Sequence, residues 1–353
     1  MRRGGLAVLV LLACACDGAP REAASPDEPP DRAEASPQEA TVITVKNYVD
    51  TQFGALVSAA TELCAAAPEP AEEGWLGEDD AIATMREAWG RARDAYERVE
   101  GAVAILFPEL DLQIDGRYEH TVELGRDTDP FDGAGFVGLH AVERILWHDA
   151  VSPEVRRFEE TLAGYWPPLA PRTAPEARQF REGLCRRLVR DTSNMREQFR
   201  PLALDHQTAW RGVLGSIEEQ AEKVLLHATG QDESRYARRT LADMRANLAG
   251  GRAVLDAYAP LLEAHPASAA PMREVNARFG ALEVAYGERS MALPDVPEGF
   301  DPEAPSREHL ATPYGRLFAL LSSASDPLEP ASLAARLREA GNAMHIAPLA
   351  RAR

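Results

Sequence analysis

The sequence predicts an all-α protein, built from two packed antiparallel helical-bundle domains that meet near residue 200. Two observations lead to this prediction. After residue 50, apolar residues recur at steps of three and four over most of the chain, which is the period of a helix that buries one face. The strict alternation of apolar and polar residues that marks a half-buried strand is nearly absent from the same region.

Residues 1–16 have the pattern of a secretory signal. Two arginines precede an apolar run from Leu6 to Ala13, which is too short to span a membrane. The letters "LLAC" resemble a bacterial lipobox that ends at Cys14, and Cys14 fits this pattern better than Cys16. An ordinary cleaved signal is the alternative. Either interpretation predicts export, and the lipobox predicts a bacterial membrane lipoprotein that faces the periplasm or the cell exterior.

Residues 17–40 are rich in Pro, Glu, Ala, Ser and Asp and contain no large apolar side chain, so we expect a disordered tether. The remainder is expected to form an N-terminal bundle over residues 41–200 and a C-terminal bundle over residues 201–353. The formal net charge of -18 argues against binding to nucleic acid. A lipid anchor followed by a tether and then a globular body is a consistent arrangement for an anchored exported protein.

The first helix is expected over residues 42–67, where prolines at 68 and 70 end it. The next runs from Asp80 to Phe107, because eight apolar residues between Ile82 and Leu106 follow one another at steps of three and four, and Pro108 stops the pattern. Further helices are expected at 136–148, 153–164, 174–200, 203–228, 234–264, 271–286, 306–323 and 331–345.

Cys64 and Cys185 are the two cysteines of the predicted globular body, and both lie in helix-like apolar surroundings. An exported pair can form a disulfide, and two buried free thiols are the alternative. Neither cysteine has the spacing of a metal site.

Two short patterns place carboxylates and an imidazole at the edges of buried helix faces. Glu97 and Glu100 are spaced as surface neighbours on one helix and flank its apolar face. The stretch "GFVGLHAVERILWHD" sets His140 and Glu143 at the margin of another apolar face. The spacing of these two residues decides nothing alone, because "HTVE" at His120 repeats it. A solvated glutamate pair and a hydrogen-bonded His–Glu pair are the alternatives to a metal site.

Asp111 and Asp115 lie in "PELDLQIDGRYEH", which we expect to be a loop that reaches back over the end of the preceding helix. Helical bundles build metal sites from inward-facing Glu and Glu-x-x-His side chains. A predicted site therefore contains Glu97, Glu100, Asp115, His140 and Glu143. One nitrogen with several hard oxygens suits Fe²⁺, Fe³⁺ or Mn²⁺, and Zn²⁺ is possible.

These motifs resemble the imelysin-like family, through the Gly-x-His-x-x-Glu pattern of Gly138, His140 and Glu143. The similarity is greatest to its EfeO/EfeM branch, which serves ferrous-iron uptake, and it extends to "LDLQIDGR" and to the segment from Thr229 to Gly251. The resemblance implies two helical bundles with a metal site at their interface, composed of the five residues above. It also implies iron acquisition and a partner such as an iron permease.

Two alternative functions follow from the same resemblance. The family was first described as peptidases, but the chain has no His-Glu-x-x-His helix and no Gly-x-Ser-x-Gly motif. No catalytic residue is therefore predicted. Some relatives are thought to bind acidic polysaccharide, for which Arg186, Arg187 and Arg190 form a candidate basic patch. The net negative charge of the chain argues against this second alternative.

Overall fold

The computed structural model describes residues 36–123, 125, 127, 129–287 and 290–346. These residues belong to one compact unit and contain helices but no strand, which confirms the all-α prediction. The signal, the lipidation site Cys14 and residues 17–35 of the expected tether lie outside the described residues. The domain boundary near residue 200 stays a prediction.

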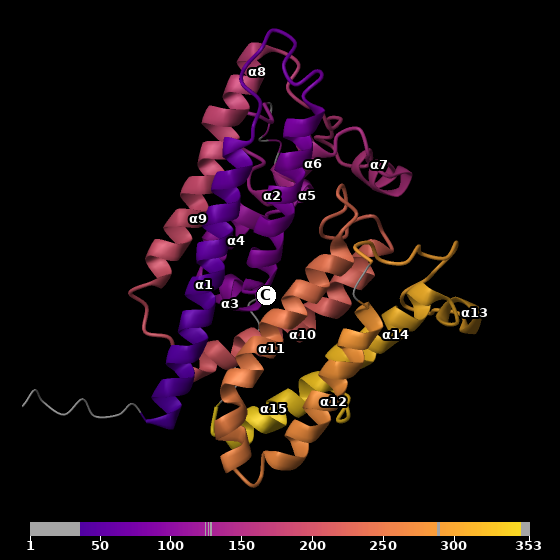
Figure 1. The fold of residues 1–353 in the computed structure, drawn as a ribbon. Coiled ribbons are helices and arrows are strands. Elements are labelled where there is room, and N and C mark those ends of the chain that lie inside the picture. The colour runs from indigo at the N-terminus through magenta and orange to yellow at the C-terminus, as the bar shows by residue number, and fades with distance from the viewer. Residues whose placement is uncertain (1–35, 124, 126, 128, 288–289, 347–353) are drawn as a thin grey trace, which may run out of the picture. The chain divides into compact units, whose positions relative to one another are not determined.

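A first group of helices lies side by side in indigo, purple and pink in Figure 1. In this group, α1 (Pro37–Ala65) packs against α2 (Asp79–Glu97) and against α9 (Arg186–Phe199). The contact face of α1 is apolar, and its Phe53 and Leu56 side chains are completely buried. The helical period that predicts this face therefore also explains how α1 packs.

The start of α1 is set by a reciprocal pair of hydrogen bonds. The Glu39 backbone N–H donates to the Ser36 hydroxyl at 3.3 Å, and the Ser36 backbone N–H donates to the Glu39 carboxylate at 2.8 Å. Such a capping box satisfies backbone donors that a helix start otherwise leaves unpaired. Residues 37–40, which the composition assigns to the tether, are consequently helical.

Near its other end, α1 is linked covalently to the α9 side of the group. Cys64 forms a disulfide with Cys185, with the two Cα atoms 5.5 Å apart. Cys185 ends the π-helical segment η1 (Phe180–Cys185), which lies between α8 (Ala174–Gln179) and α9. The sequence left open whether these cysteines form a disulfide or remain two free thiols, and the structure has the disulfide.

The prediction of a single helix from Asp80 to Phe107 is wrong at one point. Arg98 and Val99 interrupt the helix and separate α2 from α3 (Glu100–Leu106). The start of α3 rests directly on α10 (His206–His227): a Cβ atom added to Gly101 would lie 2.6 Å from the Gly212 carbonyl oxygen. We attribute the break to this close backbone approach, since tertiary contacts override a continuous helical pattern.

The segment expected to be a loop after Phe107 is also helical. It forms α4 (Pro108–Asp115) and α5 (Tyr118–Val122). Pro108 occupies the first turn of α4, where its missing N–H leaves no hydrogen bond unmade. Sequence reasoning treated Pro108 only as the end of one helix, whereas it also begins the next. Asp115 is therefore held at the last position of a helix.

A second group of helices, salmon to yellow in Figure 1, follows α9 along the chain. Its central pair is α10 with α11 (Thr240–Ala264). Helix α10 also packs against α14 (Pro313–Ser325) and α15 (Leu333–Ala343). Helix α12 (Ala269–Tyr286) packs against α11 and α15. The remaining helices are α6 (Leu139–Leu146), α7 (Pro153–Glu159) and α13 (Arg307–Leu310).

The two groups meet where α10 packs against α3 and α11 packs against α2. This contact region brings the carboxylates of α2 and α3 next to residues of the second group. Among the described helices, none is both long and apolar enough to cross a membrane.

Candidate metal centre

The start of α6 is pressed against the end of α4. Gly138 has φ of 89°, a conformation that side-chain-bearing residues rarely adopt, and a Cβ atom there would lie 2.3 Å from the Ile114 carbonyl oxygen. Only glycine allows this approach without displacing the backbone. As a result His140, in the first turn of α6, lies beside Asp115 at the end of α4.

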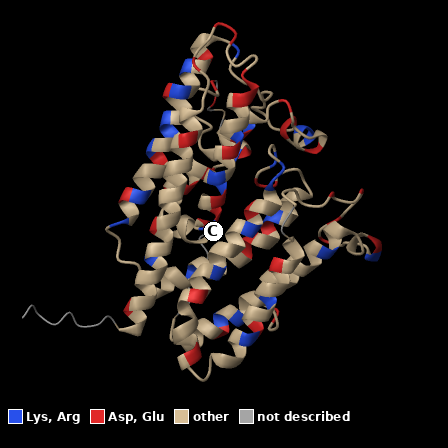
Figure 2. Cartoon of the chain, in the orientation of Figure 1, with Lys and Arg blue, Asp and Glu red and all other residues tan. Residues whose placement is uncertain are grey.

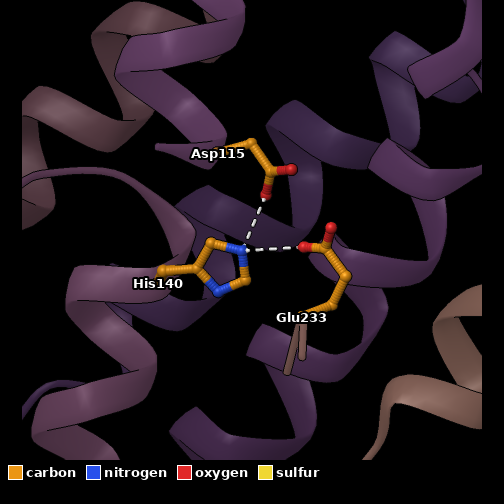
Figure 3. Close-up of side chains that lie close together, drawn as sticks. All are labelled: Asp115, His140 and Glu233. Carbon is orange, nitrogen blue, oxygen red and sulfur yellow. Dashed lines mark ion pairs between the residues drawn. The ribbon is translucent and has the colours of Figure 1, made fainter. Parts of the chain in front are cut away.

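His140 is buried, and its imidazole faces two carboxylates with one nitrogen (Figure 3). The Nε2 atom lies 3.2 Å from Asp115 Oδ1 and 3.3 Å from Glu233 Oε2. Both oxygens lie at ion-pair distance from Nε2, but neither contact has the geometry of a hydrogen bond. A buried polar atom without a hydrogen bond is costly, and it commonly indicates an absent ion or water.

Asp115, His140 and Glu233 form the one group of potential ligands that the described part of the chain brings together. Their ligand atoms all lie within 4.8 Å of one another. We call these three residues the Asp–His–Glu cluster. It unites α4, α6 and the segment between α10 and α11, which lie far apart in the sequence. The chemistry of the cluster, one imidazole and two carboxylates, suits a transition-metal ion with a preference for nitrogen and oxygen.

Glu143 binds the other side of the imidazole. Its Oε2 lies 2.9 Å from His140 Nδ1, and its Oε1 accepts hydrogen bonds from the backbone N–H groups of Tyr236 at 3.0 Å and Ala237 at 2.9 Å. When Nδ1–H donates to a carboxylate, the lone pair of Nε2 is left for a metal. Glu143 thus orients the imidazole, although the sequence suggested that it is a direct ligand.

Arg93 on α2 holds the two carboxylates of the cluster from the opposite side. Its guanidinium is fully buried and donates to Asp115, to Glu97, and at 3.1 Å to Glu233 Oε2. The same Asp115 and Glu233 oxygens face His140 Nε2. A planar guanidinium with several fixed donors can therefore set the distance between the two acidic ligands.

Glu97 and Glu100 are linked indirectly to the Asp–His–Glu cluster, through Lys223, which also faces Glu233. Both are buried, and Lys223 of α10 contacts them with Nζ–O distances of 2.8 Å and 2.7 Å. Neither belongs to the Asp–His–Glu cluster as the side chains stand. Of the five residues that the sequence predicts, the structure thus brings Asp115 and His140 together as neighbours, places Glu143 behind the imidazole, and pairs Glu97 and Glu100 with a lysine.

Glu233 is the member of the cluster that sequence reasoning missed. It lies in "TGQDESRYARRTLADMRANLAGG", which carried part of the family resemblance, but no helical spacing singled it out. Burial alone would raise the pKa of Glu233, but Lys223, His140 and Arg93 lower it well below its usual range. Glu233 therefore stays ionised as a ligand must.

The same neighbours act on the imidazole. Burial disfavours the charged imidazolium, but the carboxylates of Asp115, Glu143 and Glu233 outweigh burial and raise the pKa of His140 well above its usual value. In the metal-free protein these carboxylates therefore favour a proton on Nε2, and a metal ion that binds there must displace it.

A polar cleft of about 400 Å³ leads to the cluster from the surface. Asp115 and Glu233 form part of its lining, together with Glu100, Ala104, Pro108, Asp111, Leu112, Gly116, Arg117, His120, Glu219, Glu222 and Lys223. Burial, and then the nearby Asp115, raise the pKa of Asp111 to about 7, while the Tyr96 hydroxyl donates a hydrogen bond to it. The cleft thus gives a hydrated cation access to the two carboxylates of the cluster, Asp115 and Glu233.

The second His-x-x-Glu pattern is structurally different. His120 and Glu123 are both exposed, at α5 and just beyond it. They are not part of the Asp–His–Glu cluster. The two copies of the His-x-x-Glu pattern thus differ in burial and in the side chains around them. His120 can therefore serve as a control for His140.

One carboxylate offsets part of the charge of the candidate basic patch on α9. Arg187 and Arg190 both pair with Asp191, at 3.0 Å and 3.1 Å. Figure 2 shows basic and acidic residues interspersed along α9. These pairs weaken the case for an anionic polysaccharide on this surface.

Comparison with known proteins places these features in a family context. The family model described as Imelysin matches residues 44–303. Over 202 residues, the chain is 25% identical to the iron uptake system component EfeO of Yersinia pseudotuberculosis, a match that covers 57% of this chain and 44% of that protein. The corresponding EfeO of Escherichia coli K12 is 24% identical over 202 residues, with 57% and 44% covered. The chain thus spans less than half the length of these relatives.

Proposed function

The chain belongs to the imelysin family, and from this membership and its buried Asp–His–Glu cluster we propose that it binds a transition-metal ion as cargo in iron acquisition. Iron is the proposed metal, with manganese and zinc as competitors for the same ligands. The observation that carries the proposal is His140 Nε2, which is buried, makes no hydrogen bond and faces two carboxylate oxygens.

The proposed ligands are His140 Nε2, Asp115 and Glu233. Glu143 holds the imidazole so that Nε2 faces the ion, and the charge of the two ligand carboxylates offsets that of a divalent ion. Glu97 and Glu100 remain in the proposed site as neighbours of Glu233 through Lys223. Of the five ligands predicted from the sequence, this assignment retains Asp115 and His140, gives Glu97, Glu100 and Glu143 supporting positions, and adds Glu233.

The names of the relatives support iron as the cargo. Two of them are iron uptake system components, and they align with this chain over 202 residues. We propose by analogy that the chain passes its ion to another component of an uptake system, such as an iron permease. The uptake role and this partner are proposals, because the chain spans 44% of those relatives.

We also propose that the protein is a lipoprotein anchored at Cys14. The lipobox-like "LLAC" supports this proposal, and the position of Cys14 relative to the leucine three residues earlier favours it over Cys16. Metabolic labelling with a radioactive fatty acid tests it. Cys14→Ala should lose the label while Cys16→Ala keeps it, and equal labelling of both variants would refute the assignment.

Metal analysis of the purified full chain tests the proposed site. After equilibration with Fe²⁺ in the absence of oxygen, and separately with Mn²⁺ and Zn²⁺, mass spectrometry of the desalted protein should find bound metal. His140→Ala should lose it, whereas the matched variant His120→Ala, in the exposed copy of the pattern, should keep it. If wild-type protein and His140→Ala retain equal metal, the proposed site is wrong.

A further inference from the structure

Lys223 is a buried ammonium surrounded by carboxylate oxygens. Its side chain is 2% exposed, and Nζ lies 2.8 Å and 3.1 Å from the two oxygens of Glu97 and 2.7 Å from Glu100 Oε2. The Oε1 atom of Glu233 is 3.8 Å away. A positive charge is thus enclosed by three carboxylates in a place where water has little access.

The carboxylates around Lys223 are themselves held in position. Asn247 of α11 donates to Glu100 Oε2 at 2.8 Å, and its carbonyl oxygen accepts from Gln220 at 2.8 Å. Tyr286 in turn donates to Gln220 at 2.6 Å. The chain of hydrogen bonds runs from α12 through α10 and α11 to the ammonium position. Such an arrangement is a preformed cation position with hard oxygen donors.

Glu233 connects this position with the Asp–His–Glu cluster. Its Oε2 faces His140 Nε2 at 3.3 Å, while its Oε1 faces Lys223 Nζ. One carboxylate that bridges two cations is the usual construction of two-metal sites, where the ions lie about 3.5–4 Å apart. Helical bundles form such dinuclear sites from glutamates and Glu-x-x-His pairs. Here the second cation is a side chain.

The choice of lysine at this position is unusual for this sequence. The chain has 38 basic residues, of which only Lys46 and Lys223 are lysines. Arginine presents a planar, branched group, whereas the ammonium of lysine is a compact point charge. Arg93, in contact with the same Glu97 and Glu233, shows that the region also accommodates a guanidinium. Position 223 therefore has a small cation where arginine is the common choice.

We propose that Lys223 occupies the second cation position of a two-cation centre, so that the natural protein takes one metal ion beside a fixed ammonium. This inference rests on the proposed function for the first ion. It assigns Lys223 a role in specificity: it limits the site to one ion and keeps Glu97 and Glu100 from acting as ligands. Removing only the ammonium would leave the buried Glu100 without its cationic partner and Glu97 with Arg93 alone, a loss of positive charge that a divalent cation offsets.

Metal stoichiometry of variants of the full chain tests the proposal, with Mn²⁺ as the probe. Wild-type protein should bind one Mn²⁺ per chain. Lys223→Ala, which empties the position and suits a helix, should bind two. The electron paramagnetic resonance spectrum should change from that of an isolated Mn²⁺ to that of a coupled pair. Lys223→Arg should still bind one ion, and so should Lys46→Ala, which removes the only other lysine.

The outcomes separate the two proposals. If wild-type protein binds no Mn²⁺, Fe²⁺ or Zn²⁺, the proposed function fails, whatever Lys223→Ala does. If wild-type protein binds one ion and Lys223→Ala also binds one or none, the second cation position is refuted. Should Lys223→Ala fail to fold without metal, refolding it in Mn²⁺ decides the matter: recovery of circular dichroism with two bound ions supports the proposal, and failure to fold in Mn²⁺ overturns it.

Discussion

His140 and Glu143 lie one turn apart on α6, and the imidazole Nδ1 is 2.9 Å from a carboxylate whose other oxygen accepts two backbone N–H groups. These contacts hold Glu143 between the imidazole and the segment at Tyr236. Its effect on a metal is exerted through His140. Glu143 links the metal position to the polypeptide that carries Glu233.

Replacing Glu143 with glutamine should weaken metal binding without removing it. The amide keeps the size of the side chain but loses the charge that favours Nδ1–H, and loss of such an outer partner typically reduces metal affinity about 10–100-fold. Competition with a chelator measures the affinity. Glu123→Gln, in the exposed copy of the pattern, is the control, and equal affinity of the two variants would contradict the role of Glu143.

Gly138→Ala should destabilise the fold and disturb the site together. An alanine Cβ atom would lie 2.3 Å from the Ile114 carbonyl oxygen in a backbone with φ of 89°. Overpacking of this kind costs about 1–3 kcal/mol in the free energy of unfolding, in addition to the strain of a positive φ. Urea unfolding and the metal content of the variant measure both effects.

The control for this substitution is Gly299→Ala. Gly299 also has a positive φ, 71°, but an added Cβ atom would meet no other atom within 4 Å. It therefore reports the cost of the backbone conformation alone. If both variants lose the same unfolding free energy and keep their metal, the contact between α4 and α6 does not position His140.

Reduction of the Cys64–Cys185 disulfide should lower stability but leave metal affinity unchanged. The bridge closes a loop with a sequence separation of 121, and removing a native disulfide typically costs about 2–5 kcal/mol. The thermal midpoint of Cys64→Ser/Cys185→Ser, compared with that of the wild type with and without a reductant, measures the effect. A variant with the wild-type midpoint would show that the bridge adds no stability.

The two lysines permit a direct test of where the metal binds. In protein labelled with ¹⁵N-lysine, the two Nζ groups are the only lysine side-chain signals, from Lys46 on α1 and Lys223 beside Glu233. Mn²⁺ at the Asp–His–Glu cluster should broaden the Lys223 signal by paramagnetic relaxation and leave the Lys46 signal sharp. Equal broadening of both would indicate that Mn²⁺ binds elsewhere or without specificity.

Several parts of this centre can be predicted from the sequence. The helical period identifies the buried faces of α1, α2 and α10, and the glycine and apolar residues around His140 distinguish it from His120. Helix boundaries are less well predicted: α2 ends at Glu97, ten residues before the expected end at Phe107, because Gly101 packs directly on α10. The spacing of apolar residues from Ile82 to Leu106 fits one continuous helix as well as two consecutive helices, so it does not predict the break at Arg98 and Val99.

The sequence by itself determined the fold class, and it predicted His140 and Asp115 as ligands of a nitrogen and oxygen site, two residues that the structure places side by side. Only the tertiary structure decided that Glu233 completes the cluster and that Lys223 neutralises Glu97 and Glu100. The physical reason is the range of each effect. Helical periodicity arises between residues three or four apart, whereas the neighbours of His140 are set by the packing of α4 and of the segment between α10 and α11, which local patterns do not encode.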